Sequence, residues 1–123
     1  MGETGSVMAV DIRASQALKL LHEVNLALVR DSEQDLSARQ LTILLTVYLE
    51  PPPHTVRGLA AKLNVTKPAI TRALDTLGSL RLLSRKRDEA DKRNVIITRT
   101  VVGALYLEQL GDLVVEKAKE LPR

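Results

Sequence analysis

The sequence contains no cysteine, and only two of its 123 residues are aromatic, Tyr48 and Tyr106. The lack of cysteine excludes disulfides, thiolate metal sites and thiol catalysis. The lack of Phe and Trp disfavours proteins that stack bases of RNA or single-stranded DNA on aromatic rings. No apolar run reaches the roughly 18 residues that a membrane span needs, and the N-terminal MGETGSVMAVD has no basic region typical of a signal peptide. We therefore predict a cytoplasmic protein without a membrane partner.

Catalytic and cofactor-binding motifs are also missing. The sequence has no nucleophile–base pair, glycine-rich phosphate loop or metal-ligand cluster that can be identified from residue spacing. Its two histidines, His22 and His54, are far apart in the chain. We expect His22 to be a packing or surface residue, and His54, which follows three prolines, to be exposed. The sequence thus predicts no enzyme, no cofactor and no metal site.

Positive charge is concentrated in the middle of the chain. Residues 55–99 hold 11 Lys and Arg against 4 Asp and Glu, whereas residues 1–54 hold 4 against 7 and residues 100–123 hold 3 against 4. A basic centre between slightly acidic flanks is expected when the centre binds a polyanion and the flanks have another role. A basic face that merely contacts solvent would give the same counts.

The two flanks show helical patterns. Apolar residues recur at helical spacing from about Asp11 to Arg30, and again after Thr100, which can cap a last helix. A monomer of this size could not bury all of this apolar surface. We therefore expect the helices within 10–35 and 100–121 to pair with those of a second copy.

The segment after residue 36 predicts a buried helix. Ser37 and Gln40 have the spacing of a capping box, in which two side chains satisfy backbone N–H groups at a helix start. The following LTILLTVYLE is apolar on nearly all sides, which is typical of a central helix. The three prolines at 51–53 end it, because proline cannot donate the helical hydrogen bond.

Two short amphipathic helices come next. Thr55 can cap the first, which shows a clean apolar stripe and ends near Asn64, a residue that tolerates the left-handed conformation. Thr66 can cap the second, with Pro68 in its first turn. Helices joined by so tight a turn form a helix-turn-helix.

The pattern then changes to short strands. Residues 82–87 and residues 94–99 read as two strands, with the charged 88–93 as a hairpin tip. The second strand is favoured by its β-branched residues Val95, Ile96, Ile97 and Thr98. The predicted fold is therefore mainly α with a small β-hairpin wing (α+β). It is a winged helix-turn-helix, with a core at 37–99 between the helical flanks.

Three stretches of the chain resemble the MarR family of winged-helix transcriptional regulators. They are LSARQLTILLTVY, TVRGLAAKLNVTKPAITRALDTL and RKRDEADKRNVIITRTVVG, which together cover roughly residues 37–103. The Asp-x-Arg of the family's wing stands at Asp91 and Arg93, and Thr100 and Gly103 match the start of the helix after the wing. The resemblance implies one MarR-like domain over 1–123.

The sequence departs from the family at three places. Arg81 stands where the family usually has glycine before the first wing strand, and Arg99 stands where it usually has leucine before Thr100. The C-terminal part after the wing is about two dozen residues long, which favours one long helix there instead of two.

A helix-turn-helix places its second helix in the major groove of double-stranded DNA, with N-terminal residues near base edges. Lys67 and Arg72 suit guanine or phosphate, and Thr71 suits a base edge or a thymine methyl. The resemblance implies that Arg93 enters the minor groove. Asp91 would orient Arg93 or Arg85, although it could also be a simple turn residue. The full predicted DNA-binding set is Thr55, Arg57, Thr66, Lys67, Pro68, Thr71, Arg72, Arg85, Arg87, Lys92 and Arg93.

The predicted function is transcriptional regulation, as a repressor, by a homodimer on a pseudo-palindromic operator. The resemblance further implies a small-molecule effector, commonly aromatic or phenolic, bound between the dimerisation layer and the DNA-binding module. Two alternatives remain. The winged helix could act as a protein-interaction adaptor or antagonist of another regulator, without salt-sensitive DNA binding. It could also bind DNA without sequence preference.

Overall fold

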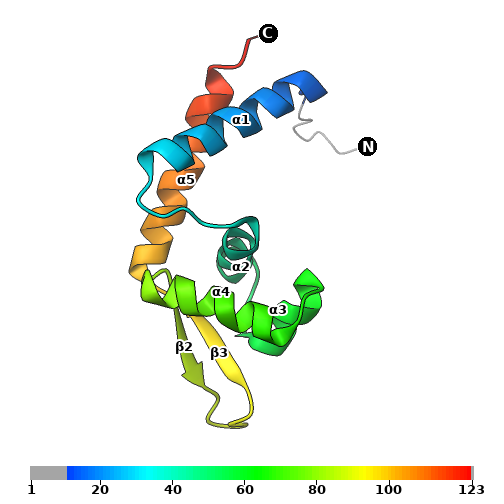
Figure 1. Cartoon of the computed structure of the whole chain (residues 1–123), viewed down its shortest axis with the longest axis vertical. Coiled ribbons are helices and arrows are strands. Elements are labelled where there is room, and N and C mark those ends of the chain that lie inside the picture. Colours follow the sequence, from blue (N-terminus) through cyan, green and yellow to red (C-terminus); the bar gives the residue numbers. More distant parts are fainter. Residues whose placement is uncertain (1–10, 123) are drawn as a thin grey trace. The chain divides into compact units, whose positions relative to one another are not determined.

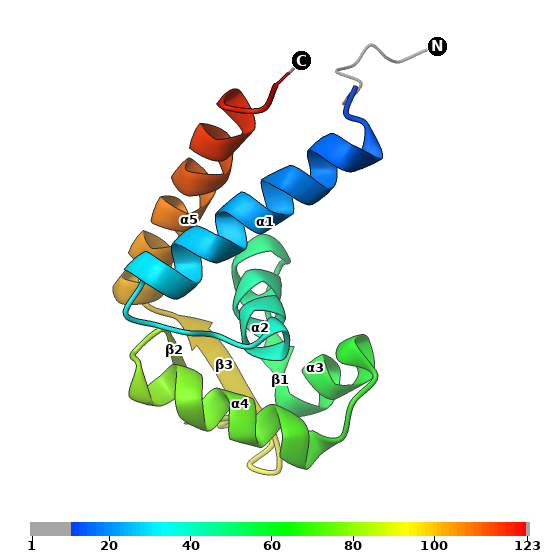
Figure 2. The ribbon, with the colours of Figure 1, turned by 45° about the horizontal axis from the view of Figure 1, so that its top comes forward.

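The computed structural model describes residues 11–122. The chain forms two compact units, one made of residues 11–32 and 112–122, the other of residues 33–111 (Figures 1 and 2). The helices are α1 (Ala14–Asp31), α2 (Ala38–Leu49), α3 (Val56–Leu63), α4 (Lys67–Ser79) and α5 (Val101–Lys119), and the strands are β1 (His54–Thr55), β2 (Leu83–Arg87) and β3 (Val95–Arg99). The predicted fold class, a mainly helical winged helix with a small β wing, is confirmed.

Local capping explains where the helices of the larger unit begin. The Ser37 hydroxyl accepts a hydrogen bond from the Gln40 N–H at 3.1 Å, and the Gln40 side chain accepts one from the Ser37 N–H at 2.8 Å. Thr55 accepts from the Gly58 N–H at 3.0 Å. Each bond satisfies an N–H that the helix itself leaves unpaired. The predicted capping box and the predicted Thr55 cap are therefore confirmed.

The turn between α3 and α4 forms as its residues predict. Asn64 ends α3 in the left-handed conformation, with φ 56° and ψ 48°. Two residues later the Thr66 hydroxyl accepts a hydrogen bond from the Ala69 N–H at 3.3 Å, and Pro68 occupies the first turn. The left-handed turn and the second cap together direct α4 away from α3 over a minimal connection.

The strands form a three-stranded antiparallel sheet in the order β1-β3-β2. The two-residue strand β1 was not predicted. It places His54 opposite Ile97 and leads directly into α3 (Figure 2). The expectation that His54 is exposed was wrong, because pairing with β3 draws the segment after the prolines into the sheet. His54 is 8% exposed, and its Nε2 lies 3.1 Å from the Glu50 carbonyl oxygen.

An aliphatic core holds α2, α3, α4 and the sheet together. Its fully buried members, among residues 11–122, include no aromatic side chain, which agrees with the composition. The largest of them are Ile43, Leu44, Val47, Ile70, Leu74, Leu77, Leu82 and Ile97. Because α2, α4 and the sheet all contribute to this cluster, α4 is fixed to the rest of the unit by burial of one face.

Tyr48 connects α2 to the start of α5. Its hydroxyl accepts a hydrogen bond from the Thr100 N–H at 2.9 Å and lies 2.8 Å from the Thr100 carbonyl oxygen. The Thr100 hydroxyl accepts from the Gly103 N–H at 2.9 Å, which confirms the predicted cap. A Cβ at Gly103 would collide with the Leu82 carbonyl oxygen and the Tyr48 hydroxyl. Only glycine permits this close approach.

The two basic departures from the family pattern have structural roles. Arg81 itself adopts the left-handed conformation, with φ 64°, that a glycine would adopt at lower cost. Arg99 donates from Nε to the Val47 carbonyl oxygen at 3.0 Å, and its guanidinium carbon lies 5.7 Å from the centre of the Tyr48 ring. Arg99 therefore satisfies a carbonyl near the C-terminal end of α2, and its charge is favourable there.

The smaller unit consists of α1 and the C-terminal end of α5. Its helix α1 buries Val24, while Leu18 and Leu21 are 67% and 60% exposed. The Gln16 side-chain amide donates to the Pro122 carbonyl oxygen at 2.9 Å, which connects the two segments of the unit. His22 is exposed. Among residues 11–122, no helix has both the length and the apolar character required to cross a membrane.

Candidate nucleic-acid interface

Helix α4 separates its side chains into a buried and an exposed face. The buried face carries Ala69, Ile70, Ala73, Leu74 and Leu77. The exposed face carries Lys67, Pro68, Thr71, Arg72, Asp75, Thr76 and Ser79. The apolar face fixes the helix to the core, so that the polar face is presented to solvent as a rigid surface.

The two cations at the start of α4 are available for an external partner. Lys67 and Arg72 are exposed, and neither side chain has a hydrogen-bond or ion-pair partner within residues 11–122. Pro68 and Thr71 lie beside them on the same exposed face. A helix N-terminus with free cations is suited to binding phosphates or the acceptor atoms of guanine.

The predicted residues on α3 and at the caps differ in their availability. Thr55 is half-buried, and its hydroxyl already accepts from Gly58. The exposed Thr66 also uses its hydroxyl oxygen as a cap. Arg57 is exposed and close enough to the wing to help lower the pKa of Asp91. Thr55 is thus mainly a structural residue, whereas Arg57 contributes positive charge beside the wing.

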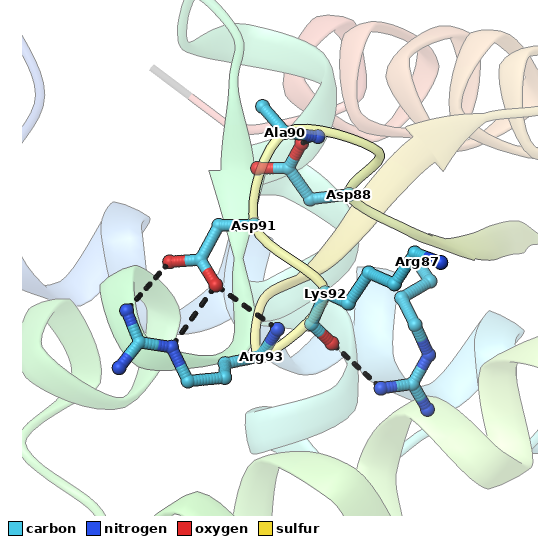
Figure 3. Close-up of polar contacts among 6 residues, drawn as sticks. All are labelled: Arg87, Asp88, Ala90, Asp91, Lys92 and Arg93. Carbon is cyan, nitrogen blue, oxygen red and sulfur yellow. Dashed lines mark hydrogen bonds and ion pairs between the residues drawn. The ribbon is translucent and has the colours of Figure 1, made fainter.

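At the tip of the wing, Asp91 holds Arg93 in a bidentate ion pair (Figure 3). Arg93 Nε lies 3.0 Å from Asp91 Oδ1, Arg93 Nη2 lies 3.2 Å from Oδ2, and the Arg93 N–H donates to Oδ1 at 3.1 Å. These hydrogen bonds from Arg93, with a smaller contribution from Arg57, lower the pKa of the Asp91 carboxyl. The Arg93 side chain is nevertheless 85% exposed. The pair therefore orients a guanidinium without covering it.

A second contact stabilises the base of the wing tip. Arg87 donates from Nη1 to the Lys92 carbonyl oxygen at 2.6 Å, across the end of the hairpin (Figure 3). Asp88 accepts from the Ala90 N–H at 2.9 Å and so shapes the turn. The Lys92 side chain remains exposed. The wing thus presents Lys92 and Arg93 from a loop that its own polar contacts define.

Arg85 lies in a different environment from the other wing cations. Its Nη2 is 2.8 Å from Oδ1 of Asp75 on α4, and its side chain is only 34% exposed. Of the two partners considered for Asp91, the structure gives Arg93, while Arg85 pairs with Asp75. Asp75 was missed by the sequence reasoning. Its helical spacing, three residues after Arg72 and four after Thr71, is the sequence sign that it shares the exposed face of α4.

A helix-turn-helix followed by a basic, antiparallel wing defines the winged-helix class of proteins. A family model and several solved structures agree with it. The MarR family model matches residues 34–94, and a mutant of E. coli MarR is 30% identical, with a TM-score of 0.66 over 88% of this chain and 80% of that one. The chain belongs to the MarR family, and the predicted resemblance is confirmed.

Other solved structures show the same fold. BldR, a transcriptional regulator from Sulfolobus solfataricus, is 30% identical, with a TM-score of 0.63 over 87% of this chain and 74% of that one. A mutant of S. aureus MepR bound to an oligodeoxyribonucleotide is 21% identical, with a TM-score of 0.74 over 85% of this chain and 74% of that one. No curated protein sequence matches the chain significantly.

Proposed function

We propose that this chain is a sequence-specific, double-stranded DNA-binding transcriptional repressor that acts as a homodimer. The observation that carries the proposal is the pairing of two exposed basic elements in one unit. Helix α4 presents Lys67 and Arg72 without side-chain partners within residues 11–122, and the wing presents an oriented Arg93. A helix of this kind enters the major groove, and an extended arginine suits the adjacent minor groove.

The DNA-binding surface comprises the residues predicted from the sequence except Arg85, whose side chain pairs with Asp75, and these residues have different roles. The residues that contact base edges are Pro68, Thr71 and Arg72. The residues that contact phosphates are Arg57, Thr66, Lys67, Arg87 and Lys92. Thr55 acts through its cap of α3. Arg93 enters the minor groove, oriented by Asp91. The bound MepR mutant supports DNA as the partner of this fold.

The homodimer is proposed from exposed apolar surface. In addition to Leu18 and Leu21, Val29 of α1 is 66% exposed, and Val101 and Val115 of α5 are 76% and 54% exposed. Large apolar side chains exposed in such number on two helices indicate surface that an association partner covers. The whole chain then acts as one MarR-like domain in which residues 10–35 and 100–121 pair between copies. A two-fold dimer requires a pseudo-palindromic operator with half-sites about one helical turn apart.

We further propose that the protein is cytoplasmic, because a repressor acts on DNA inside the cell. It acts by binding and has no catalytic activity. The proposal also includes response to a small-molecule effector that favours one of two dimer shapes. Effector binding is supported by the family resemblance alone. It is tested by adding aromatic carboxylates and phenols to the protein–DNA complex and measuring release.

A random duplex library tests the function. Selection with the purified full-length chain should enrich an inverted repeat, and sedimentation should give a dimer in the free and bound states. Arg72→Ala should reduce affinity by about 1–3 kcal/mol and relax preference at particular base pairs. A protein-interaction adaptor would enrich no sequence. An architectural protein would bind with a steep salt dependence but without enrichment.

A further inference from the structure

Asp75 places a negative charge on the proposed DNA-reading face of α4, one helical turn after Thr71. Pro68, Thr71, Arg72 and Asp75 follow one another at offsets 0, 3, 4 and 7, so they lie along one face of α4, and all are exposed. Helices in the major groove contact bases through side chains with this spacing. The Asp75 side chain is 61% exposed. A helix that inserts Arg72 into the groove therefore brings the Asp75 carboxylate close to the bases.

An ionised carboxylate accepts hydrogen bonds and donates none. Phosphates repel it, and so do the acceptor atoms N7 and O6 of guanine. The donors in the major groove are the N4 amine of cytosine and the N6 amine of adenine. The adenine amine lies beside the acceptor N7, whereas cytosine presents its amine without a neighbouring acceptor on the same base. Cytosine is therefore the base that suits this carboxylate best.

Arg85 fixes the position of the Asp75 carboxylate through an ion pair. Its Nη2 holds Oδ1 of Asp75 at 2.8 Å, and Oδ2 has no hydrogen-bond partner in the described part of the chain. The guanidinium lies over α4 near Gly78, where a Cβ would be 3.9 Å from Nη2. The positive charge of Arg85 reduces the repulsion between the Asp75 carboxylate and the DNA phosphates. The ion pair also fixes Oδ1, so that Oδ2 can accept a hydrogen bond from a base.

From these contacts we propose that Asp75 is a specificity-determining residue that accepts a hydrogen bond from cytosine N4 at one position of each half-site. Arg85 is its positioning residue and does not itself contact DNA. This inference rests on the proposed function and deepens it. Arg72, three residues earlier, supplies donors where Asp75 supplies an acceptor, so α4 reads a guanine and a cytosine at neighbouring steps.

The test uses the operator obtained by selection, with every position of one half-site replaced in turn by each base. Affinities are measured for the full-length wild type, Asp75→Ala, Asp75→Asn and the control Thr76→Ala, which alters a neighbouring exposed residue of α4. For Asp75→Ala we expect the preference for cytosine at one position to fall about tenfold, with the other positions unchanged. Thr76→Ala should keep the cytosine preference.

Asp75→Asn gives a readout that a purely structural residue could not produce. Asparagine pairs with adenine through N6 and N7, so the preferred base at that one position should shift from cytosine towards adenine. Arg85→Gln should weaken the cytosine preference at the same position, because it releases the carboxylate. Thermal melting checks that each variant is folded.

Two results would overturn the inference. If Asp75→Ala and Asp75→Asn lower affinity equally at every base replacement, Asp75 is only a structural partner of Arg85, while the proposed function stands. If the wild type has an operator without a preferred cytosine opposite α4, the inference also fails, because there is no base for Asp75 to contact. Selection that enriches no sequence at all is distinguishable from both, because it contradicts the proposed function itself.

Discussion

The guanidinium of Arg93 lies against the carboxylate of Asp91, with Nε 3.0 Å from Oδ1 and Nη2 3.2 Å from Oδ2. Two parallel hydrogen bonds fix the plane of a guanidinium as well as its position. The pair is on the surface, so it adds little to the stability of the fold. Because of this ion pair, the orientation of the Arg93 guanidinium on the wing is already fixed in the free protein.

Arg93→Ala should weaken DNA binding across all sequences. Loss of one cation from the wing removes one phosphate or minor-groove contact, so the slope of log affinity against log salt should decrease by about one. Titration of the selected operator at several salt concentrations measures both quantities. Arg39→Ala is the control, because Arg39 is an exposed cation of α2 outside both the predicted DNA-binding set and the proposed dimerisation helices. An unchanged slope for Arg93→Ala would exclude this arginine from the interface.

The ion pair also predicts how Asp91 titrates. Hydrogen bonds from Arg93 hold the pKa of the Asp91 carboxyl below its ordinary value. A carboxyl with a lowered pKa in the folded state contributes stability above its unfolded pKa. This contribution is lost as the pH falls through the folded pKa. Carbon-detected NMR should therefore show Asp91 titrating below its ordinary pKa in the wild type and closer to it in Arg93→Ala. Equal pKa values in the two proteins would mean that the pair does not form in solution.

Gly103→Ala should destabilise the fold. The added methyl group would collide with the Leu82 carbonyl oxygen and the Tyr48 hydroxyl, and would disturb the bonds that connect Tyr48 to Thr100. Such overpacking costs about 1–3 kcal/mol. Urea unfolding at fixed protein concentration measures it. The matched control is Gly111→Ala in the same helix, where a Cβ meets no atom of the described residues within 4 Å.

Gly111→Ala is expected to leave stability unchanged or to raise it by about 0.5–1 kcal/mol, because alanine favours the helix. If both glycine variants had the same stability, the close approach at Gly103 would be refuted.

Arg81→Gly should stabilise the protein. Arg81 adopts φ 64°, a conformation that costs a residue with a Cβ about 1–2 kcal/mol. Glycine removes this strain but has more freedom in the unfolded chain, so the net gain in the free energy of unfolding should be about 0.5–1 kcal/mol. Denaturant melts at equal protein concentration compare the variant with the wild type. A less stable Arg81→Gly would show that the arginine side chain has a stabilising contact in solution.

Features that depend on a few neighbouring residues could be predicted from the sequence. The caps at Ser37, Thr55 and Thr66 and the left-handed turn at Asn64 involve groups at most three residues apart. The contact between Asp91 and Arg93 joins residues two apart. Arg93 was one of the two partners predicted for Asp91. In each of these cases, local chemistry alone determines the partner.

Features that depend on tertiary contacts could not be predicted. Strand β1 has only two residues, too few for any periodicity, and it forms because β3 pairs with it. The burial of His54 follows from that pairing. Asp75 and Arg85 are ten residues apart on a helix and a strand, so only the packed unit brings them together. Arg99 likewise reaches a carbonyl 52 residues earlier in the chain.

The most direct measurement of the central claim is a competition experiment with the full-length protein. A labelled duplex carrying the selected inverted repeat competes with an unlabelled duplex of the same length and composition in scrambled order, at 50 and 200 mM salt. A dimeric, sequence-specific regulator should prefer the repeat by about 10³-fold or more, while both affinities fall steeply with salt. Equal affinity for the two duplexes, or binding that does not change with salt, would contradict the proposed function.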